Sequence, residues 1–436
     1  MSTLREEFLD TLENNILRFW LDNMVDLEHG GFYGQMTGDG TLVKDADKGG
    51  ILTARILWSF SAAYRVVGKK EYLDAATRAK DYILRHFYDQ EFGGTYWSVD
   101  YLGRPKDTKK QFYAIGFAIY GLSEYARATH DSEALDYALR LFHCIEQHSL
   151  DTAYNGYIEA STREWGEIAD MRLSELDANY PKSQNTHLHI IEPYTNLLRC
   201  LREWGDRDYN DYSNYSNYSN YNNYSHYNAD GENNISPVAM LPRVEAAVRN
   251  LIHIFTHHIL NPATHHLDLF FENDWTRGGG ALESYGHDIE CSWLIHEAAL
   301  VVGDSLLLKE VEPIVRMVAK ASEKGLNADG SMVHEANLDT GYVDTDRHWW
   351  VQAEAVVGFY NIYQHFGEEE AYQHFMDCWA YIKDNLIDRE GGEWWWSRDP
   401  EGNINRRDDK AGFWKCPYHN SRMCLELIER LSATAE

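Results

Sequence analysis

The stretch EFGGTYWSVD at residues 91–100 returns near the end of the chain as EGGEWWWSRD at residues 390–399. Both stretches hold a Gly-Gly pair, then aromatic side chains, then a closing Asp. An exposed run of indoles is a liability on a protein surface, so Trp394, Trp395 and Trp396 need neighbours. A motif that recurs in this form indicates an internal repeat, and the repeat predicts the fold.

The same Gly-plus-aromatic pattern occurs six times. Its steps are 62–64 residues, except for one step of 110 residues. Shortening that step by about 45 residues restores the period and leaves six units of roughly 63 residues. The six stretches are EHGGFYGQM at Gly31, EFGGTYWSVD at Gly94, AYNGYIEAS at Gly156, THHLDLFFEND at His266, ADGSMVHEAN at Gly330 and EGGEWWWSRD at Gly392.

The long step contains a low-complexity insertion at residues 206–236. Its centre, DYSNYSNYSNYNNYSHYN at residues 211–228, has no aliphatic residue to bury. Such a composition cannot offset the entropy lost on ordering, so we expect a mobile surface insertion. A second interpretation is that its many tyrosines bind sugars or partners.

Between the Gly-plus-aromatic stretches the sequence predicts pairs of helices. Residues 51–67 and 112–129 are rich in Ala and apolar on nearly every face, whereas residues 132–149 carry the narrower apolar stripe of a half-exposed helix. Buried and amphipathic helices therefore alternate. Six units predict an all-α fold, an (α/α)6 barrel of about twelve helices, formed by residues 1–436 as a single domain. An open solenoid is the alternative, but the sequence has no capping repeat.

The composition fits one large globular domain. The chain has 436 residues, of which 44% are hydrophobic. Its formal net charge of −29 argues against nucleic acid and anionic membranes as partners. We see no apolar run of 18 residues and no secretory leader, and the six cysteines lack paired spacing. We therefore expect a cytoplasmic monomer whose partner is a small oligosaccharide substrate.

Polar side chains stand at the starts of helices that are otherwise apolar, where they would form the floor of a barrel cavity. Every unit supplies at least one of them. They are Arg55, Tyr113, Asn185 with His189, His287 with Glu290, Trp350 with Glu354, and His419.

Three of these pairs are spaced three or four residues apart, so each pair shares one helix face. A Glu beside a His on such a face can accept the imidazole N–H, fix its tautomer and raise its basicity. We expect this of Glu290 and His287. His187 and His189 lie about 200° apart on a helix, so only one of them points inward.

A single histidine on a helix is more often structural than catalytic. Function is the better interpretation for His287 beside Glu290, and for His419 between a Trp and an Asn-Ser-Arg cluster. Trp350 and Trp414 could be ordinary packing, but aromatic residues that recur at the starts of buried helices favour a sugar platform. The histidines interpreted as structural are His187, His257, His265 and His348.

The sequence does not match the common motifs for metal or nucleotide binding. HLH at residues 187–189 has the wrong helical geometry for a zinc pair and no HExxH partner. DTDRHWWVQAEA at residues 344–355 resembles the start of a calcium loop, but Trp349 stands where Gly is required and Ala355 where Glu is required. No P-loop or GxGxxG precedes a helix. We therefore predict no cofactor and no metal.

Five stretches together resemble the cellobiose 2-epimerase branch of the N-acylglucosamine 2-epimerase superfamily. The resemblance covers essentially the whole chain outside the insertion. It implies an (α/α)6 barrel that interconverts the glucose and mannose configurations at the reducing end of β-1,4-linked disaccharides, such as cellobiose and lactose, without a cofactor. The stretches are FYGQMTGDG (32–40), NTHLHIIEPY (185–194), SYGHDIECSWL (284–294), WWVQAEAVVGF (349–359) and KAGFWKCPYHNSRMCLE (410–426).

The positions of residues in these motifs imply their roles. His287 and His419 would be the acid/base pair that exchanges the proton at C2. The resemblance places Arg55, Asn185, His189, Glu290 and Glu354 around the reducing sugar and Trp350 and Trp414 against its rings, and Tyr113 and Trp349 complete our predicted binding set.

Elementary chemistry agrees with this mechanism. The C2 hydrogen of an aldose is acidic only when the ring is open and the carbonyl is polarised. Histidine suits the proton transfers because its pKa lies near working pH, and each positioned transfer contributes roughly 10²–10⁴-fold. His189 and Glu290 would assist ring opening and tautomer control. Arg55 would hold the enediolate oxygen, where a preorganised donor is most effective.

Other functions remain open at this stage. An (α/α)6 glycosidase with inversion needs two carboxylates about 6.5–9.5 Å apart, whereas this predicted site is centred on histidine. A non-catalytic sugar-binding barrel would need the aromatics but not the Arg and His residues. A monosaccharide epimerase or an aldose–ketose isomerase is the closest alternative.

Two departures from the family pattern are the insertion and Pro193, which stands where relatives often carry Ala. We expect neither to touch the site. The three indoles of EGGEWWWSRD are expected in the rim of the sixth unit, partly packed against neighbouring loops with one face on the sugar path.

Overall fold

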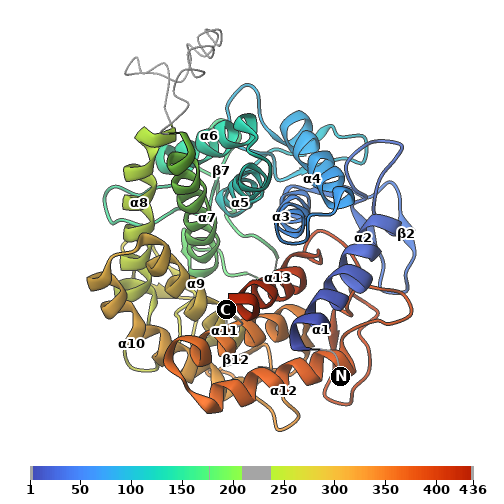
Figure 1. The fold of residues 1–436 in the computed structure, drawn as a ribbon. Coiled ribbons are helices and arrows are strands. Elements are labelled where there is room, and N and C mark those ends of the chain that lie inside the picture. The colour runs from blue at the N-terminus through green and yellow to red at the C-terminus, as the bar shows by residue number, and fades with distance from the viewer. Residues whose placement is uncertain (1–2, 176, 209–236, 434–436) are drawn as a thin grey trace.

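The computed structural model describes residues 3–175, 177–208 and 237–433. The helices form two concentric rings around a common axis (Figure 1). The inner ring consists of α3 (Gly50–Val67), α5 (Phe112–Thr129), α7 (Gln184–Asp208), α9 (Tyr285–Val302), α11 (Trp349–Phe366) and α13 (Tyr418–Ala433).

The outer ring holds one helical rod for each unit. Its first rod runs through α1 (Leu4–Asp10), a π-helical segment (Thr11–Leu17) and α2 (Arg18–Asn23). The other rods are α4 (Lys70–Tyr82), α6 (Ser132–His148), α8 (Pro237–Ile254), α10 (Ser305–Ser322) and α12 (Glu369–Asn385); π-turns at Ile83–Phe87 and Phe255–Ile259 and a 3-10 turn at Glu323–Gly325 extend α4, α8 and α10.

The inner ring closes on itself. Each inner helix contacts the next along the chain, and α13 returns to contact α3. Each later outer helix packs on the inner helix that precedes it, and α1 packs on α13. This is the (α/α)6 barrel that the repeat predicts, and the contact between α13 and α3 excludes the open solenoid.

The predicted helix positions agree closely with the structure. The helix predicted at residues 112–129 is α5, and those predicted at 51–67 and 132–149 differ from α3 and α6 by one residue at one end. The first fourteen residues of α3 are all buried, whereas α6 buries a stripe along one side. Inner helices surrounded on all sides and outer helices exposed on one side follow from this pattern.

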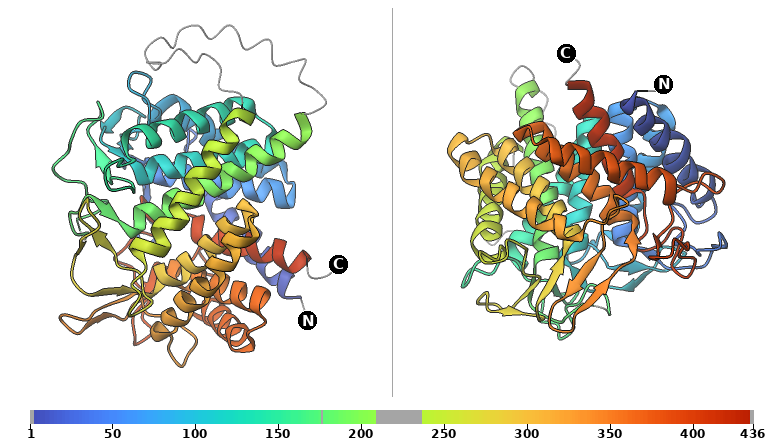
Figure 2. Two further views of the ribbon diagram at one scale, coloured as in Figure 1. Left: turned by 90° about the vertical axis from the view of Figure 1, so that its left-hand side faces the viewer. Right: turned by 90° about the horizontal axis from the view of Figure 1, so that it is seen from below.

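Short antiparallel strands gather at one end of the barrel, and α1 begins and α13 ends at the other (Figure 2). The strands form the sheets β1-β2, β3-β4-β5, β6-β7, β8-β9-β10, β11-β12-β13 and β14-β15. Their bounds are β1 (Gln35–Met36), β2 (Leu42–Val43), β3 (Lys48–Gly49), β4 (Ser98–Val99), β5 (Pro105–Asp107), β6 (Lys110–Gln111), β7 (Ala160–Ser161), β8 (Lys182–Ser183), β9 (Phe270–Phe271), β10 (Arg277–Gly278), β11 (Leu282–Ser284), β12 (Glu335–Asn337), β13 (Tyr342–Asp344), β14 (Arg347–His348) and β15 (Ser397–Arg398).

The strands link each unit to the next. The strand that leads into an inner helix pairs with a strand of the following unit, as β3 does with β4 and β14 with β15. The bridge between Met36 and Ala411 joins the sixth unit back to the first. The strand end of the barrel is therefore a closed ring as well.

The Gly-plus-aromatic stretches are the turns that follow the outer helices. Each turn is closed by an isolated bridge, such as Val25 with Phe32 or Ile387 with Trp394. In four of the units a buried Lys, placed shortly before an inner helix, pairs with an Asp in the turn. These Lys–Asp clamps are Lys48–Asp26, Lys110–Asp89, Lys182–Asp151 and Lys410–Asp388, with N–O distances of 2.7–2.9 Å.

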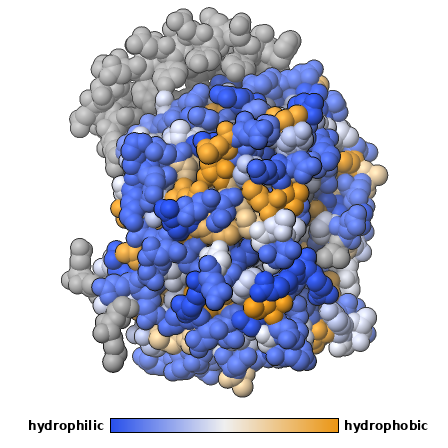
Figure 3. Space-filling model, turned by 90° about the vertical axis from the view of Figure 1, so that its right-hand side faces the viewer, coloured by the Kyte–Doolittle hydropathy of each residue, from blue (hydrophilic) through white to orange (hydrophobic). Residues whose placement is uncertain are grey.

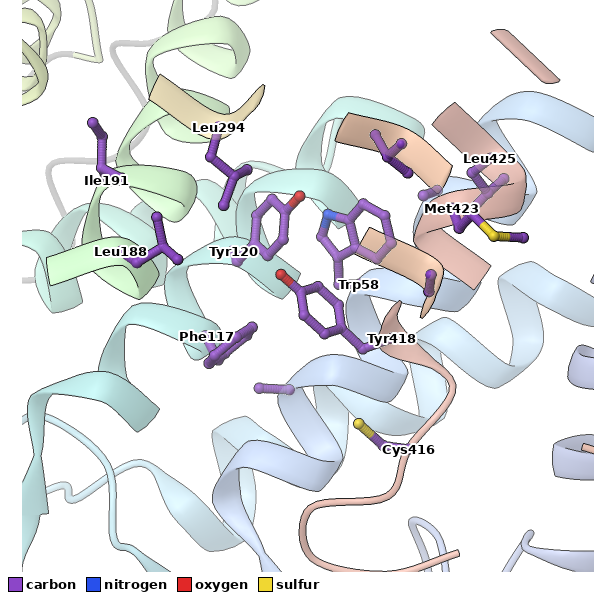
Figure 4. Close-up of a cluster of buried hydrophobic side chains, with 14 of the residues drawn as sticks. Trp58, Phe117, Tyr120, Leu188, Ile191, Leu294, Cys416, Tyr418, Met423 and Leu425 are labelled. Atoms are coloured by element: carbon purple, nitrogen blue, oxygen red, sulfur yellow. The ribbon is translucent and has the colours of Figure 1, made fainter. Parts of the chain in front are cut away.

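Aromatic side chains from three inner helices pack beneath the strand end (Figure 4). Trp58 of α3 stacks on Tyr120 of α5 with ring centroids 5.0 Å apart, and both rings meet Tyr418 of α13 edge-on. Phe117 lies 5.2 Å from Tyr418 in the same manner. The barrel axis is therefore filled by side chains below the polar residues that the sequence singled out.

On the face drawn in Figure 3 most of the surface is hydrophilic, with hydrophobic side chains in small groups among polar ones. No helix within the described ranges has the length and apolarity needed to cross a bilayer. The predicted insertion at residues 206–236 begins inside α7, which continues to Asp208. The remainder of that predicted insertion lies outside the described residues.

Candidate active site

The predicted polar side chains all lie in the first two turns of the inner helices, at the strand end of the barrel. The ring of helices brings these starts together around the axis (Figure 1). They are Arg55 on α3, Tyr113 on α5, Asn185 and His189 on α7, His287 and Glu290 on α9, Trp349, Trp350 and Glu354 on α11, and His419 on α13.

Arg422 of α13 joins carboxylates from three other inner helices. Its Nη2 donates to Oε1 of Glu290 and to Oε1 of Glu354, each at 2.6 Å. Its Nη1 contacts Glu192 and the Tyr418 hydroxyl. Because a buried carboxylate is costly unless a cation pairs with it, Arg422 determines where these three acids sit.

His419 is held through one ring nitrogen. Its Nδ1 lies 2.7 Å from Oε1 of Glu354, and the other oxygen of Glu354 accepts from Nε1 of Trp293 at 3.0 Å. The carboxylate is thus fixed at both oxygens and accepts the Nδ1–H of the imidazole. In that tautomer Nε2 of His419 carries the lone pair.

His189 follows the same arrangement, with Nδ1 3.1 Å from Oε2 of Glu192. The helix is kinked at this residue (φ −92°, ψ 16°), because Pro193 has no N–H to give the His189 carbonyl. The released carbonyl lies against Gly116 of α5, where a Cβ would be 2.4 Å from the oxygen. The expectation that Pro193 leaves the site untouched is therefore wrong.

His287 is held by its neighbour on the preceding strand, since its Nδ1 lies 2.8 Å from Oγ of Ser284. The prediction that Glu290 accepts its N–H is wrong. Glu290 turns to Arg422 instead, because the guanidinium is the stronger partner for a buried carboxylate. The His287 ring lies 4.8 Å from Trp350, which in turn lies 5.6 Å from His419.

Three histidines therefore share one design. His189, His287 and His419 each use Nδ1 for a fixed polar partner, and for none of them is a protein partner found at Nε2 within the described residues. Trp350 contacts the rings of both His287 and His419. Three imidazole nitrogens around one cavity floor can each take or give a proton of a bound molecule.

Arg55 and Arg422 are the cations of this floor, and each keeps an Nε without a hydrogen-bond partner among the described residues. Nη2 of Arg55 donates to the Tyr113 hydroxyl at 2.8 Å, and the Arg55 guanidinium carbon lies 4.2 Å from the Phe117 ring. Oδ1 of Asn185 and Oε2 of Glu290 also have no hydrogen-bond partner among the described residues. Buried polar atoms without partners are suited to a polar ligand.

Aromatic side chains extend the site toward the rim. The half-buried Trp414 lies 6.0 Å from Tyr113 and 6.0 Å from Trp97, and Trp97 also contacts Phe413. Trp349, predicted to bind substrate, packs against Trp396 at 4.7 Å with Lys415 over its ring. Its Nε1 has no hydrogen-bond partner among the described residues, so substrate binding by Trp349 stays a prediction.

The three consecutive indoles have three different surroundings. Trp394 is fully buried and forms the bridge that closes the sixth turn. Trp395 lies beneath the Lys410 ammonium, 3.8 Å from its ring, and Trp396 stacks on Trp349. The indoles support the Lys–Asp clamp and the start of α11. The contacts found among the described residues give none of them the expected face on the sugar path.

Burial sets the protonation of the histidines. It lowers the pKa of His419 well below its ordinary value, and the charges of Arg55 and Arg422 lower it further. Burial likewise lowers the pKa of His287 well below the ordinary value and lowers that of His189. Near pH 7 these imidazoles are therefore neutral and able to act as bases.

The pKa values of Glu290 and Glu192 are shifted in opposite directions. Burial raises the pKa of Glu290 well above its ordinary value, and the charge of Glu354 raises it further. Burial would also raise the pKa of Glu192, but Arg422 and His189 lower it to about 2. Glu192 is thus a permanent anion, whereas Glu290 keeps a proton to higher pH. Pairs of acids with separated pKa values are typical of acid/base sites.

The sequence did not single out Glu192, Tyr418 or Arg422. All three stand inside the family motifs; Glu192 and Arg422 lie deeper along their helices than the predicted residues His189 and His419, whereas Tyr418 is the first residue of α13. The spacing of Arg422 from His419 is three residues, which does place both on one helix face. A charged residue inside an otherwise apolar helix is the sequence signal that could have found Glu192 and Arg422.

Comparison with known proteins gives the family. The sequence matches the family described as N-acylglucosamine 2-epimerase over residues 31–194 and 242–422. A cellobiose 2-epimerase of Bacteroides fragilis is 54% identical over 425 residues, which is 98% of each chain. A cellobiose 2-epimerase of Ruminococcus albus is 38% identical over 431 residues, 99% of this chain and 98% of its own. The chain belongs to the N-acylglucosamine 2-epimerase family.

Solved structures agree with the family assignment. Cellobiose 2-epimerase from Spirochaeta thermophila aligns with a TM-score of 0.85 at 37% identity, over 99% of this chain and 98% of that one. A GH76 α-mannanase of Bacteroides thetaiotaomicron, at 10% identity and a TM-score of 0.61, shares the fold alone. As a member of the N-acylglucosamine 2-epimerase family, the protein is a carbohydrate epimerase, an enzyme of the isomerase class.

Proposed function

We propose that this epimerase inverts C2 of the reducing-end residue of β-1,4-linked disaccharides, converting cellobiose to glucosyl-mannose and lactose to epilactose. The reaction removes and returns a proton through an enediolate and uses no cofactor. The identity of 54% to the cellobiose 2-epimerase of Bacteroides fragilis supports this substrate class. The observation that carries the chemistry is the set of histidines held at Nδ1, which leaves Nε2 for the substrate.

The residues divide the reaction between them. His287 and His419, both in contact with Trp350, are the acid/base pair that exchanges the C2 proton. A neutral imidazole takes the proton as base, and the imidazolium so formed can give a proton back to C2 of the enediolate as acid. His189, fixed by Glu192, opens the sugar ring. Arg55 donates from its free Nε to the oxygen that becomes negative in the enediolate. Glu354 stabilises the imidazolium that forms when His419 takes the proton.

The aromatic rim favours a disaccharide over a monosaccharide. One sugar ring occupies the floor between the histidines, and a second ring needs an apolar platform further out. Trp414, beside Trp97 and Phe413, provides that platform at the half-buried edge of the site. The second candidate function is monosaccharide isomerisation, since D-mannose isomerase of Marinomonas mediterranea is 21% identical over 434 residues.

The experiment is product analysis after incubation with cellobiose, lactose, glucose, mannose and N-acetylglucosamine. We expect glucosyl-mannose and epilactose, with little turnover of the monosaccharides. Trp414→Ala should raise KM for cellobiose and leave the residual reaction with glucose unchanged. Fructose or mannose as the main product from monosaccharides, with disaccharides untouched, would favour the second candidate.

We further infer one catalytic domain over residues 1–436, interrupted by the insertion at residues 206–236, that works as a cytoplasmic monomer. The residues assigned to the reaction, with Tyr113 beside Arg55, come from all six inner helices of one barrel. The six cysteines are buried and unpaired, which suits a reducing compartment.

A further inference from the structure

Three ligating side chains meet at the strand end, beside the site but outside the proposed machinery. His334 precedes β12, Asp344 ends β13, and His348 ends β14. Nδ1 of His334 lies 2.9 Å and Nε2 of His348 lies 3.3 Å from the same oxygen, Oδ2 of Asp344. The three ligand atoms lie within 4.8 Å of one another.

Three groups of His and acidic side chains in the described residues could hold a metal ion. The group with Asp344 differs from the other two because, within the described ranges, no Lys or Arg neutralises its carboxylate. Among the residues that the structure describes, no Lys or Arg forms an ion pair with Asp344; the side chains that contact its Oδ2 are the two imidazoles. The other two groups of this kind are compensated. Lys320 pairs with both Glu323 and Glu370 beside His374, and Arg422 pairs with both Glu290 and Glu354 beside His419.

The geometry suits a small divalent ion. Tetrahedral bonds of about 2.0–2.1 Å to nitrogen and oxygen place neighbouring ligand atoms about 3.3–3.4 Å apart. Of the three separations, that between His348 and Asp344, 3.3 Å, already has this value, and that between His334 and Asp344, 2.9 Å, needs to open by a few tenths of an ångström. The third, between the two imidazole nitrogens, is at most 4.8 Å. Two imidazoles and one carboxylate are a ligand set that zinc and its neighbours accept, with one position left open.

The ligands are held by paired backbone and remain accessible. The His334 N–H donates to the Asp344 carbonyl, and β12 pairs with β13 through Glu335 and Asp344. His348 is in register with Ser397 of β15. The side chains of the three ligands are between 16% and 24% exposed, so an ion and a bound water can reach them.

We propose that His334, Asp344 and His348 form a binding site for a divalent transition-metal ion of the zinc type at the rim of the active site. The His334 ring lies 5.5 Å from Trp350, which also contacts His287 and His419. An ion bound there holds the His334 ring in place against Trp350. It also adds a positive charge beside the indole that His287 contacts. Occupancy therefore slows turnover, and the ion is an inhibitor of the reaction rather than a participant in it.

The sequence did not indicate this site because its ligands are spread over residues 334–348 with none of the spacings of common zinc motifs. In the sequence His348 looks like a structural histidine, and DTDRHWWVQAEA resembles only the start of a calcium loop. The hairpin of β12 and β13 brings His334 back beside Asp344.

Binding is tested with Co²⁺, whose d–d absorption reports ligand geometry, on the full-length protein without an affinity tag. We expect one equivalent of Co²⁺ to give visible bands in the wild type. The bands should disappear in Asp344→Asn and in His348→Ala and persist in the control His374→Ala, which alters the compensated group. Far-UV circular dichroism confirms that each variant folds. Equal bands in all four proteins, or none in the wild type, would overturn the site.

The effect on turnover rests on the proposed function and is measured separately. We expect EDTA-treated enzyme to be fully active on cellobiose, added Zn²⁺ to slow it several-fold, and Asp344→Asn and His348→Ala to keep most of their activity at the same Zn²⁺ concentration. Equal inhibition of wild type and variants would place the inhibitory ion elsewhere and refute this role. If cellobiose is not a substrate, the Co²⁺ spectra still decide whether the ion binds.

Discussion

At the scale of single residues, the site consists of histidine bases, two of which are positioned by acidic residues that Arg422 binds. Arg422 gathers Glu192, Glu290 and Glu354, and two of these acids then hold histidines by Nδ1. The acids therefore act through the histidines. Burial keeps the imidazoles neutral, so that Nε2 can accept a proton.

Glu354→Gln tests this indirect role. The amide keeps the volume but removes the charge that stabilises the His419 imidazolium, so we expect kcat to fall by at least about tenfold. The limb of the pH–rate profile that belongs to His419 should move to lower pH, because the pKa of His419 drops when the anion is lost.

The control is Glu146→Gln. Glu146 accepts hydrogen bonds from Tyr157 and Tyr194 outside the site, so its loss affects stability without moving the pH profile. An unchanged profile in Glu354→Gln would show that Glu354 is merely structural.

Gly116→Ala tests the kink at His189. The added methyl would meet the His189 carbonyl at 2.4 Å, so either α5 or the kink must shift. We expect a large loss of kcat with a modest loss of stability, measured by steady-state kinetics and thermal unfolding. Gly121→Ala is the matched control, since its methyl would meet the Ala54 carbonyl at 2.8 Å, away from the histidines. Equal losses of kcat in both variants would remove the special role of Gly116.

At the scale of elements, the repeated turn fixes each inner helix to its unit. A buried Lys shortly before the helix reaches the turn Asp, as Lys48 does to Asp26 at 2.7 Å and Lys410 to Asp388 at 2.7 Å. An aromatic ring covers the ammonium, Tyr82 over Lys48 for example. The Gly-plus-aromatic sequence is the visible part of this clamp.

Lys48→Met tests the clamp. It leaves the Asp26 carboxylate buried without its cation, so we expect a loss of about 3–5 kcal/mol in the free energy of unfolding. Adding Asp26→Asn should restore part of that loss. The exposed pair Lys70–Asp74 is the control, because Lys70→Met should cost no more than about 0.5 kcal/mol. A small effect of Lys48→Met, measured by denaturant unfolding, would contradict a structural role for the clamp.

The sequence predicted elements better than contacts. Apolar periodicity located α5 at both ends, and the repeat period predicted the ring, because both depend on local pattern. The partners of charged groups could not be predicted in this way. From the sequence, Glu290 could accept a hydrogen bond from either His287 or Arg422. The packing of α9 against the other inner helices places it against Arg422. Trp349 and Trp350 are adjacent, yet Trp349 packs against Trp396 whereas Trp350 contacts both His287 and His419.

At the scale of the whole molecule, the barrel has two different ends (Figure 2). The strand end holds the site. Toward the other end, Arg65 of α3 pairs with the buried Glu124 of α5 at 2.6 Å, and Arg127 of α5 pairs with the same carboxylate at 2.8 Å. The barrel therefore has stabilising ion pairs at the end opposite the site as well as the Lys–Asp clamps at the strand end.

This arrangement predicts how stability depends on acid. Burial would raise the pKa of Glu124, but Arg127 and Arg65 lower it to about 2, below its ordinary value of 4.5. A depressed pKa gives stability that is present above pH 4.5 and is lost as the pH falls toward 2. We expect Glu124→Gln to unfold more easily at pH 7 and to lose less further stability between pH 4.5 and 2 than the wild type. Parallel melting curves of the two proteins over that range would contradict this.

The central claim is that His287 and His419 exchange the C2 proton of the reducing sugar through an enediolate. Turnover of cellobiose in D₂O, followed by NMR of the products, tests it most directly. The account predicts deuterium at C2 of the reducing residue, an intact glycosidic bond, and a fall of roughly 10²–10⁴-fold in label incorporation for His287→Ala and for His419→Ala in folded protein. Epimerised product without deuterium at C2, or release of glucose, would contradict the account.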